Sequence, residues 1–320
     1  MTMSATDRKR RAGRGFRHWA VLYRGEPGFV DGTLPFIREG IDAGDPTLVM
    51  VSAQKIELLR NVLGADADRV HFEDMGQVGS NPARIIPAWQ RFVDEHGGSE
   101  RPLRGIGEPI CATRTAPELV ECQRHEALLN LAFADTVDLE LLCPYDAAAL
   151  DPLVIDEAQR SHPLLVTGGH EHASGSYRGL EEIAEPFNVP LPDAPPGAEE
   201  WRFEAATLRQ LRASIRRYGR RAGLDAEKAD NLVIGANELA SNSVVHGGGE
   251  GTARLWRDNG AVVCEVRDRG RMRLPLAGRV RPPVHKAEGR GLWLANQVCD
   301  LIQIRSLAEG TVVRAQVSIA

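Results

Sequence analysis

The feature that most limits how this chain can fold is a proline-rich segment near its middle, PFNVPLPDAPPGAE, at residues 186–199. Proline fixes its own backbone angle and lacks a donor N–H, so such a segment favours an extended, fairly stiff spacer without a core of its own. We therefore predict two domains, at residues 16–185 and 200–320, preceded by a disordered basic arm at residues 1–15. The 320 residues suffice for two domains of ordinary size, and no internal repeat relates them.

Composition argues against several classes of protein. Hydrophobic residues make up 42% of the chain and charged residues 26%, values typical of a soluble globular protein. No apolar run approaches the roughly eighteen residues that a membrane span requires, and a net charge of −5 argues against direct nucleic-acid binding. The cysteines are odd in number and form no CxxC pair, which predicts reduced thiols in a cytoplasmic protein. They are Cys111, Cys122, Cys143, Cys264 and Cys299.

Strand and helix patterns alternate through the first domain. Short apolar runs such as Leu48–Val51 have the character of buried parallel strands, and they alternate with helical runs such as Lys55–Leu63 and residues 118–134. This alternation predicts an α/β domain with helices layered on a mostly parallel sheet. The segment His170-Glu171-His172 lies among glycine and serine, and we expect it to be a loop.

Polar residues in this domain allow two further interpretations. Glu108 follows a predicted strand and His125 lies on a predicted helix, so both are candidates to line a pocket at the carboxyl ends of the strands. A structural ion pair or a helix cap is the alternative for them. Cys122 and His125, with Cys111 and Cys143, are also conceivable as a zinc site. Because no paired ligand spacing supports zinc, we expect these cysteines to be small core hydrophobes.

Several segments of this half resemble a known family. They are HWAVLYRGEPGFVDGTLPFIREGIDAGDPTLVMVS, EDMGQVGSNPARIIPAW, GIGEPI, CQRHEALLN and LLCPYD. Together they resemble the MEDS domain, the sensory module of methanogen and methylotroph regulators. The resemblance covers about residues 16–180 and implies a sensory domain whose ligand it leaves undefined.

In the second domain the stretch GANELASNSVVHG, residues 235–247, predicts a helix with a polar edge. Glu238 and Asn242 are four residues apart, which places them on one helix face. A carboxylate can take a proton from a nucleophile or from water, and a carboxamide oxygen suits Mg²⁺. By spacing alone the pair is typical of a solvated helix face. A different, mostly apolar face is formed by Leu232, Ala236, Leu239 and Ser243.

Three further motifs follow in order. Two β-rich runs join through the hairpin signal Asp258-Asn259-Gly260, and the second run ends in Asp268-Arg269-Gly270. Glu288-Gly289-Arg290-Gly291-Leu292 opens an amphipathic helix, and Glu309-Gly310-Thr311 separates two more β-rich runs. Asn-box, Asp-x-Gly, Gly-x-Gly-Leu and Gly-Thr in this order resemble the Bergerat ATP-binding fold of histidine kinases and anti-sigma-factor serine kinases. Over residues 200–320 the similarity is greatest to the serine kinases, and it implies an α/β sandwich.

The resemblance also implies residue roles. Asn242 supplies its side-chain oxygen to the Mg²⁺ that bridges the ATP phosphates, and Glu238 is the catalytic residue that orients or deprotonates the attacking hydroxyl. Asp268 accepts the adenine amino proton. Free N–H groups before the second helix favour phosphate. The other nucleotide-binding residues implied are His246, Gly270, Gly289, Arg290, Gly291, Leu292 and Thr311.

Taken together, the resemblances imply a bacterial signalling regulator. Its activity would be that of an ATP-dependent protein serine kinase that phosphorylates an antagonist protein under sensory control. The implied partners are a sigma factor and a STAS-type antagonist, with an unknown ligand at the sensory domain, and a homodimer is left open. The alternatives are a non-catalytic nucleotide-dependent anti-sigma binder, an ATP hydrolase and a sensor histidine kinase. The last is disfavoured because no helix pair with a phosphoacceptor histidine is present.

Two features bear on these alternatives. The usual Asp-x-Gly-x-Gly motif lacks its second glycine, because Met272 stands in that position. A side chain there would narrow the space over the ribose and weaken ATP binding. The predicted helix that holds Arg209–Arg221 carries arginines over most of its surface, and it is the candidate surface for the sensory domain or for an acidic partner.

Overall fold

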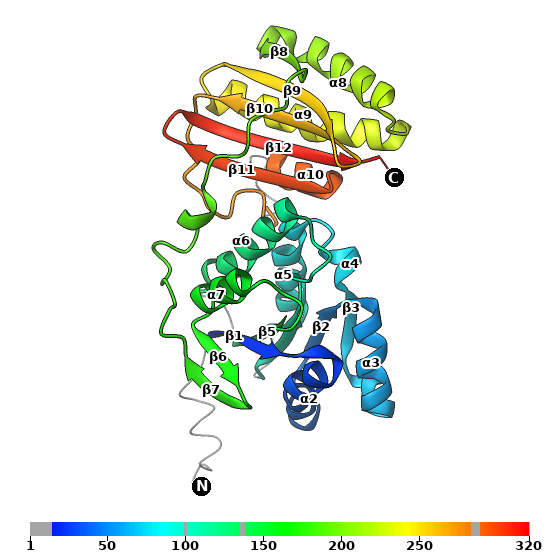
Figure 1. Ribbon diagram of the computed structural model, residues 1–320, viewed down its shortest axis with the longest axis vertical. Helices are drawn as coiled ribbons and strands as arrows, with labels where there is room; N and C mark the ends of the chain where they lie inside the picture. The colour runs from blue at the N-terminus through cyan, green and yellow to red at the C-terminus, as the bar shows by residue number, and fades with distance from the viewer. Residues whose placement is uncertain (1–14, 99–100, 135–137, 283–288, 320) are drawn as a thin grey trace. The chain divides into compact units, whose positions relative to one another are not determined.

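The computed structural model of the chain describes residues 15–98, 101–134, 138–282 and 289–319. It divides into two compact units, one made of the residues up to Gly79 with Ala88–Ile183 and the other of Ser80–Pro87 with Ala184–Ala320 (Figure 1). Each unit has its own hydrophobic core. Apart from Gly15, the predicted basic arm lies outside the described residues.

The first unit is built on a seven-stranded sheet with the order β3-β2-β4-β5-β1-β6-β7. Neighbouring strands are parallel except for the antiparallel pair β6 and β7. The predicted mostly parallel α/β class is therefore confirmed. The strands are β1 Phe16–Tyr23, β2 Thr47–Val51, β3 His71–Asp74, β4 Leu103–Gly107, β5 Leu139–Asp146, β6 Leu164–Thr167 and β7 His170–Ala173.

Helices cover both faces of this sheet. Trp19 and Val21 of β1 share one core with residues of α2 and α3. On the other face Trp89 of α5 lies so close to Gly105 of β4 that a Cβ there would come within 2.6 Å of the ring, and α6 and α7 share this side. The helices are α2 Gly25–Ala43, α3 Ala53–Leu63, α4 Met75–Val78, α5 Ile85–His96, α6 Ala116–Ala132 and α7 Pro152–Ser161.

The loop expected at His170–His172 is wrong, because these residues belong to strand β7. Gly168 and Gly169 connect β6 to β7, with φ angles of +59° and +79°. Two successive residues with positive φ match the twist of a tight hairpin, and glycine adopts that backbone without steric cost. The glycines that suggested a loop are the turn of a hairpin.

The second unit is an antiparallel sheet with the order β11-β12-β10-β9-β8, packed on one face by three helices. Alternate residues of β10, such as Cys264 and Val266, meet Leu232 and Leu239 of α9 in the core. This is the two-layer α/β sandwich that the resemblance implied. The elements are β8 Glu199–Glu204, α8 Leu208–Ala222, α9 Ala226–His246, β9 Glu250–Asp258, β10 Ala261–Asp268, α10 Gly291–Val298, β11 Leu301–Leu307 and β12 Gly310–Ser318.

The hairpin between β9 and β10 confirms the turn signal in the sequence. Asn259 and Gly260 both have positive φ, at +43° and +79°. Their geometry is that of a two-residue hairpin turn, in which asparagine followed by glycine is favoured. The turn positions β10 so that its last residue, Asp268, lies opposite Thr311 of β12.

The proline-rich segment is held along the sheet of the second unit. Asn188 exchanges two hydrogen bonds with Ser306: its Nδ2 donates to the Ser306 carbonyl at 2.7 Å, and the Ser306 N–H donates to its Oδ1 at 2.9 Å. The Arg314 guanidinium donates to the Pro192 carbonyl. Because proline offers no N–H, side chains make these attachments.

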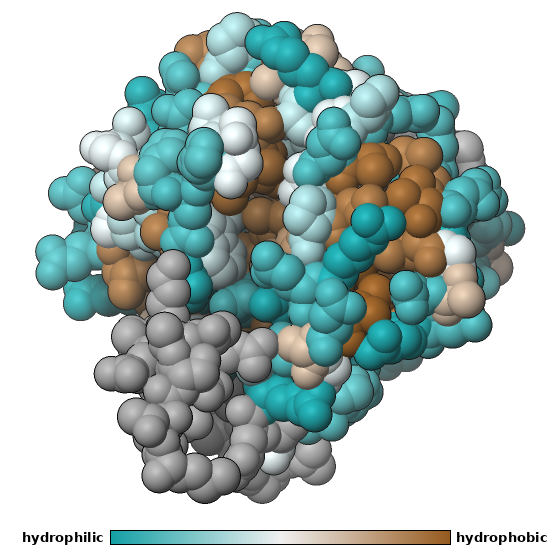
Figure 2. Space-filling model, turned by 90° about the horizontal axis from the view of Figure 1, so that it is seen from below, coloured by the Kyte–Doolittle hydropathy of each residue, from teal (hydrophilic) through white to brown (hydrophobic). Residues whose placement is uncertain are grey.

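The surface is mixed in character. On the face shown in Figure 2, hydrophobic side chains gather in two areas that are separated and bordered by hydrophilic residues. Within the described ranges, no helix combines the length and hydrophobicity that crossing a membrane would require.

Candidate functional site

Helix α9 holds the polar pair that the sequence singled out. The helix begins after Asp225, whose carboxylate accepts the Lys228 N–H at 2.8 Å and so caps the helix. Its apolar face, which includes Leu232 and Leu239, is buried against the sheet. Glu238 and Asn242 consequently lie on an adjoining edge, where both are half-buried.

Asp268 is oriented by two hydrogen bonds at the end of β10. Its Oδ2 accepts the Ser243 hydroxyl at 2.6 Å, and its Oδ1 accepts the Gly270 N–H at 2.7 Å. The Thr311 hydroxyl donates to the Gly270 carbonyl at 2.8 Å. Ser243 of α9, the end of β10 and Thr311 of the Gly-Thr motif therefore lie close together around Asp268 and Gly270.

The Gly-x-Gly motif brings the start of α10 beside α9. A Cβ at Gly291 would lie 2.6 Å from Glu238 Oε2 and 3.6 Å from the amide nitrogen and oxygen of Asn242. A side chain at residue 291 would therefore displace the Glu238 carboxylate, while Asn242 lies at ordinary contact distance. Gly289 has a φ of +80°, which also favours glycine.

These residues surround a pocket of about 420 Å³, a size within the range of small-molecule sites. Glu238 and Arg290 are not lining residues. Glu238 lies beside the lining residue Gly291, and Arg290 is exposed. Of the residues singled out in the sequence, the pocket is lined by Asn242, His246, Asp268, Gly270, Gly289, Gly291, Leu292 and Thr311.

Met272 lines the same pocket. It is half-buried and packs against the core of the unit, and its N–H donates to the Ser306 hydroxyl at 2.8 Å. The side chain at the position of the missing glycine therefore forms part of the pocket wall. Residues 283–288, which include Glu288 of the Gly-x-Gly motif, lie outside the described residues.

The chemistry of this pocket fits a nucleotide with a divalent cation. Its lining offers the carboxylate of Asp268, which can accept from an amino group, and the side-chain oxygen of Asn242, and the Glu238 carboxylate lies beside the lining residue Gly291. Apolar side chains in the lining, including Leu239, Met272 and Val313, can contact a flat ring.

Glu108 of the first unit takes part in a structural ion pair. Both Glu108 oxygens accept from Lys55 Nζ at 2.6 Å, and the Tyr23 hydroxyl donates to Glu108 at 2.5 Å. Burial raises the pKa of Glu108, and the Lys55 ammonium opposes that rise. This is the ion pair that was the alternative to a ligand site. A cavity of about 880 Å³ in this unit is lined by Tyr23, Trp19, Phe36 and other residues, but not by Glu108 or His125.

All five cysteines are free thiols. Cys111 is exposed and the other four are buried. Burial raises the pKa of Cys122 and of Cys264 to about 12, so both are held as neutral thiols. The Cys122 thiol donates to the Pro109 carbonyl at 3.4 Å.

Family models match both units. Residues 17–163 match MEDS, the methanogen/methylotroph, DcmR sensory domain, and residues 202–317 match the histidine kinase-like ATPase domain. The chain thus carries a MEDS domain followed by a histidine kinase-like ATPase domain. No curated protein matches it. A solved structure of the RsbU and RsbW domains of Rv1364c from Mycobacterium tuberculosis is similar at 19% identity with a TM-score of 0.29. The match covers 38% of this chain and 32% of that one, about a third of its length.

Proposed function

We propose that the second unit binds ATP with Mg²⁺ and phosphorylates a serine of a small antagonist protein, as an anti-sigma-type kinase. The observation that carries this proposal is the closeness of Gly291 to both Glu238 and Asn242. A carboxylate and a carboxamide thus lie beside the start of helix α10, where backbone N–H groups favour phosphate. The match to the histidine kinase-like ATPase domain supports nucleotide binding.

Asp268 reads the adenine in this proposal. Its two oxygens are turned by the Ser243 hydroxyl and the Gly270 N–H, and each retains a lone pair that can accept from an amino group. A guanine, which presents a carbonyl at the corresponding place, would face the carboxylate with repulsion. Asp268 is therefore the residue that would select ATP over GTP.

In this proposal Asn242 binds the metal ion and Glu238 acts on the nucleophile. Asn242 Oδ1 would hold Mg²⁺, which supplies charge neutralisation for the phosphates when it is bound. Glu238 lies beside Gly291, where it would accept the proton of the incoming serine hydroxyl as a general base. Both side chains project from one turn of a packed helix, so their separation is fixed.

The partners follow from this class of activity. We expect a sigma factor and a STAS-type antagonist as protein partners, in the cytoplasm, with a ligand of the MEDS domain controlling the transfer. Control requires that this ligand bind two states of the protein with different affinity. The arginines of α8 offer planar donors to acidic groups on a partner.

A non-catalytic binder is the second candidate. Met272 in the pocket wall favours it, because a side chain over the ribose position restricts the nucleotide. In that case ATP would stabilise the fold for partner binding, without phosphotransfer.

The test compares Asn242→Ala with Glu238→Ala in the full chain. Calorimetry should show loss of Mg²⁺-dependent ATP binding in Asn242→Ala and near-normal binding in Glu238→Ala. With γ-labelled ATP and candidate antagonist proteins, both variants should fail to transfer phosphate. Unimpaired binding by Asn242→Ala would remove the Mg²⁺ assignment, and binding without transfer in the unaltered protein would favour the non-catalytic candidate.

A further inference from the structure

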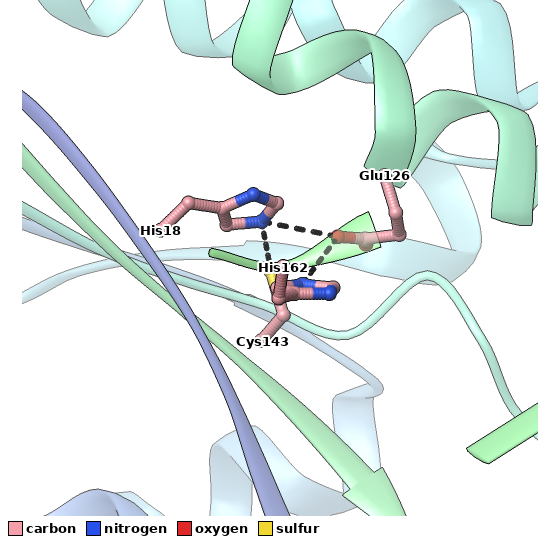
Figure 3. Close-up of side chains that lie close together, drawn as sticks. All are labelled: His18, Glu126, Cys143 and His162. Atoms are coloured by element: carbon pink, nitrogen blue, oxygen red, sulfur yellow. Dashed lines mark hydrogen bonds and ion pairs between the residues drawn. The ribbon is translucent and has the colours of Figure 1, made fainter. Parts of the chain in front are cut away.

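A buried polar cluster in the first unit takes no part in the proposed nucleotide chemistry. It consists of His18 on β1, Glu126 on α6, Cys143 on β5 and His162, the residue that directly follows α7. None of the four is more than 1% exposed. One potential ligand atom from each lies within 4.8 Å of the others, and Figure 3 shows the four side chains converging.

The topology of the sheet brings these residues together. Strands β1 and β5 pair in parallel with Ala20 opposite Cys143. Residues two apart on a strand share a face, so His18 and Cys143 lie on the same side of the sheet. Helices α6 and α7 contact each other over that side, and they deliver Glu126 and His162.

Both imidazoles are held with Nε2 facing the cluster. His18 Nδ1 lies 3.1 Å from Asn130 Oδ1, and the Asn130 amide nitrogen donates to the Ser161 carbonyl, so its oxygen is turned toward the ring. His162 Nδ1 lies 2.7 Å from the Ala158 carbonyl, which can only accept. In neutral rings the proton is therefore on Nδ1, and each Nε2 carries a lone pair. Metal-binding histidines typically have their other ring nitrogen held by an oxygen acceptor in this way.

The Nε2 atoms of His18 and His162 each lie 3.3 Å from the same oxygen, Glu126 Oε2. Lone pairs at that distance repel unless a proton or a cation lies between them. Neither carboxylate oxygen of Glu126, nor His162 Nε2, has a partner in hydrogen-bond geometry within the described part of the chain. An ionised carboxylate this deeply buried without donors is strongly unfavourable.

The distances match ligands around one ion. His18 Nε2 lies 3.3 Å from Cys143 Sγ, as well as 3.3 Å from Glu126 Oε2. In a tetrahedral zinc site with nitrogen, oxygen and sulfur ligands at their usual bond lengths, neighbouring ligand atoms are about 3.3 to 3.6 Å apart. The 3.3 Å separations of His18 Nε2 from Cys143 Sγ and of both imidazole Nε2 atoms from Glu126 Oε2 are thus those of a zinc site, and the ligand types are those that zinc takes.

We propose that His18, Glu126, Cys143 and His162 bind a zinc ion. Two neutral imidazoles, one carboxylate and one thiolate balance the two positive charges of zinc, so the buried complex is neutral. Binding releases the Cys143 thiol proton to solvent. Four protein ligands leave no open position, as in a structural zinc site, and the ion joins two strands to the helices that cover them.

This proposal revises the expectation that Cys143 is only a core hydrophobe. It also differs from the zinc set considered on the sequence, because Cys111, Cys122 and His125 are not ligands here.

The first test is metal content. Elemental analysis of the tag-free full-length protein should find about one zinc per chain, and Cys143→Ala and His162→Ala should retain less than about a tenth of it. Cys122→Ala is the matched control, because Cys122 is equally buried and lies one turn before Glu126 on α6, yet its thiol contacts the Pro109 carbonyl. It should keep its zinc. Equal zinc in Cys143→Ala and the unaltered protein would overturn the proposal.

A second test uses the unaltered protein, so its main result does not depend on whether the variants fold. After removal of zinc by a chelator, titration of the unaltered protein with Co²⁺ should give the visible absorption of tetrahedral cobalt and a thiolate charge-transfer band, both complete at about one equivalent. Cys143→Ser, checked for native circular dichroism, should lose the charge-transfer band. Absence of zinc in the purified protein, together with no cobalt spectrum, would mean that Glu126 is instead neutralised by a protonated histidine.

Discussion

In the proposed function, Asp268 determines which base the pocket accepts. Because both of its oxygens are oriented by the Ser243 hydroxyl and the Gly270 N–H, replacing one oxygen by an amide nitrogen introduces a donor where two acceptors are needed. We expect Asp268→Asn to lower the preference for ATP over GTP by about tenfold or more, the effect of losing one hydrogen bond to a charged group. Competition binding measures this, and an unchanged preference would remove Asp268 as the base-reading residue.

Met272 is a second single side chain with a measurable consequence. It lines the nucleotide pocket and packs on the core, so its removal opens the pocket and also costs some stability. We expect Met272→Gly to tighten ATP binding by roughly threefold, which corresponds to about 0.7 kcal/mol. Calorimetry checks this, with Leu274→Gly, the exposed lining neighbour, as the control. Unchanged or weaker binding would mean that Met272 does not restrict the nucleotide.

Among the elements of the first unit, β4 and α3 are joined by one buried ion pair. Glu108, which follows β4, accepts from Lys55 of α3 and from Tyr23 of β1. Removing the carboxylate leaves a partly buried ammonium without its partner, so Glu108→Ala should lower the free energy of unfolding by about 3 kcal/mol. Urea unfolding measures it. Glu26→Ala, which loses only an exposed contact with Gln54, should change stability by less than about 0.5 kcal/mol.

Helix α8 offers a test of partner binding in the second unit. Arg216 pairs with Asp230 at 2.8 Å and Arg217 contacts the Ser214 hydroxyl at 3.3 Å, both at the surface. Exposed pairs of this kind contribute little to stability. Replacing Arg216 and Arg217 with Glu should therefore preserve folding and ATP affinity but abolish capture of an acidic partner in a pull-down. Capture at the level of the unaltered protein would exclude this face.

Across the full chain, the two separate cores predict two unfolding transitions in calorimetry. ATP with Mg²⁺ should raise the unfolding temperature of the ATPase unit alone. At an ATP concentration one hundred times Kd, the free energy of unfolding of that unit should rise by about 2.7 kcal/mol. Zinc removal should lower the unfolding temperature of the MEDS unit alone. A single transition that responds to both treatments would show that the units unfold together.

Most residues of the proposed nucleotide site, which the structure brings to one pocket, could be identified from the sequence because each motif is local. A helical repeat alone puts Glu238 and Asn242 on one face, and a strand end or a Gly-x-Gly turn identifies the other motifs. The hairpin at Asn259 could be read in the same way. The hairpin at Gly168 was missed because its strands are short and its glycines also suit a loop. How near Gly291 comes to Glu238 required the packing of α10 on α9.

The sequence by itself determined the α/β class of the fold and the motif residues that line the pocket of the second unit, because these depend on neighbours along the chain. Only the tertiary structure decided the order of the strands and the cluster of His18, Glu126, Cys143 and His162. No short spacing links these four residues. They meet because β1 lies between β5 and β6 in the sheet, while α6 and α7 cover the same face, and such non-local pairing leaves no periodic trace in the sequence.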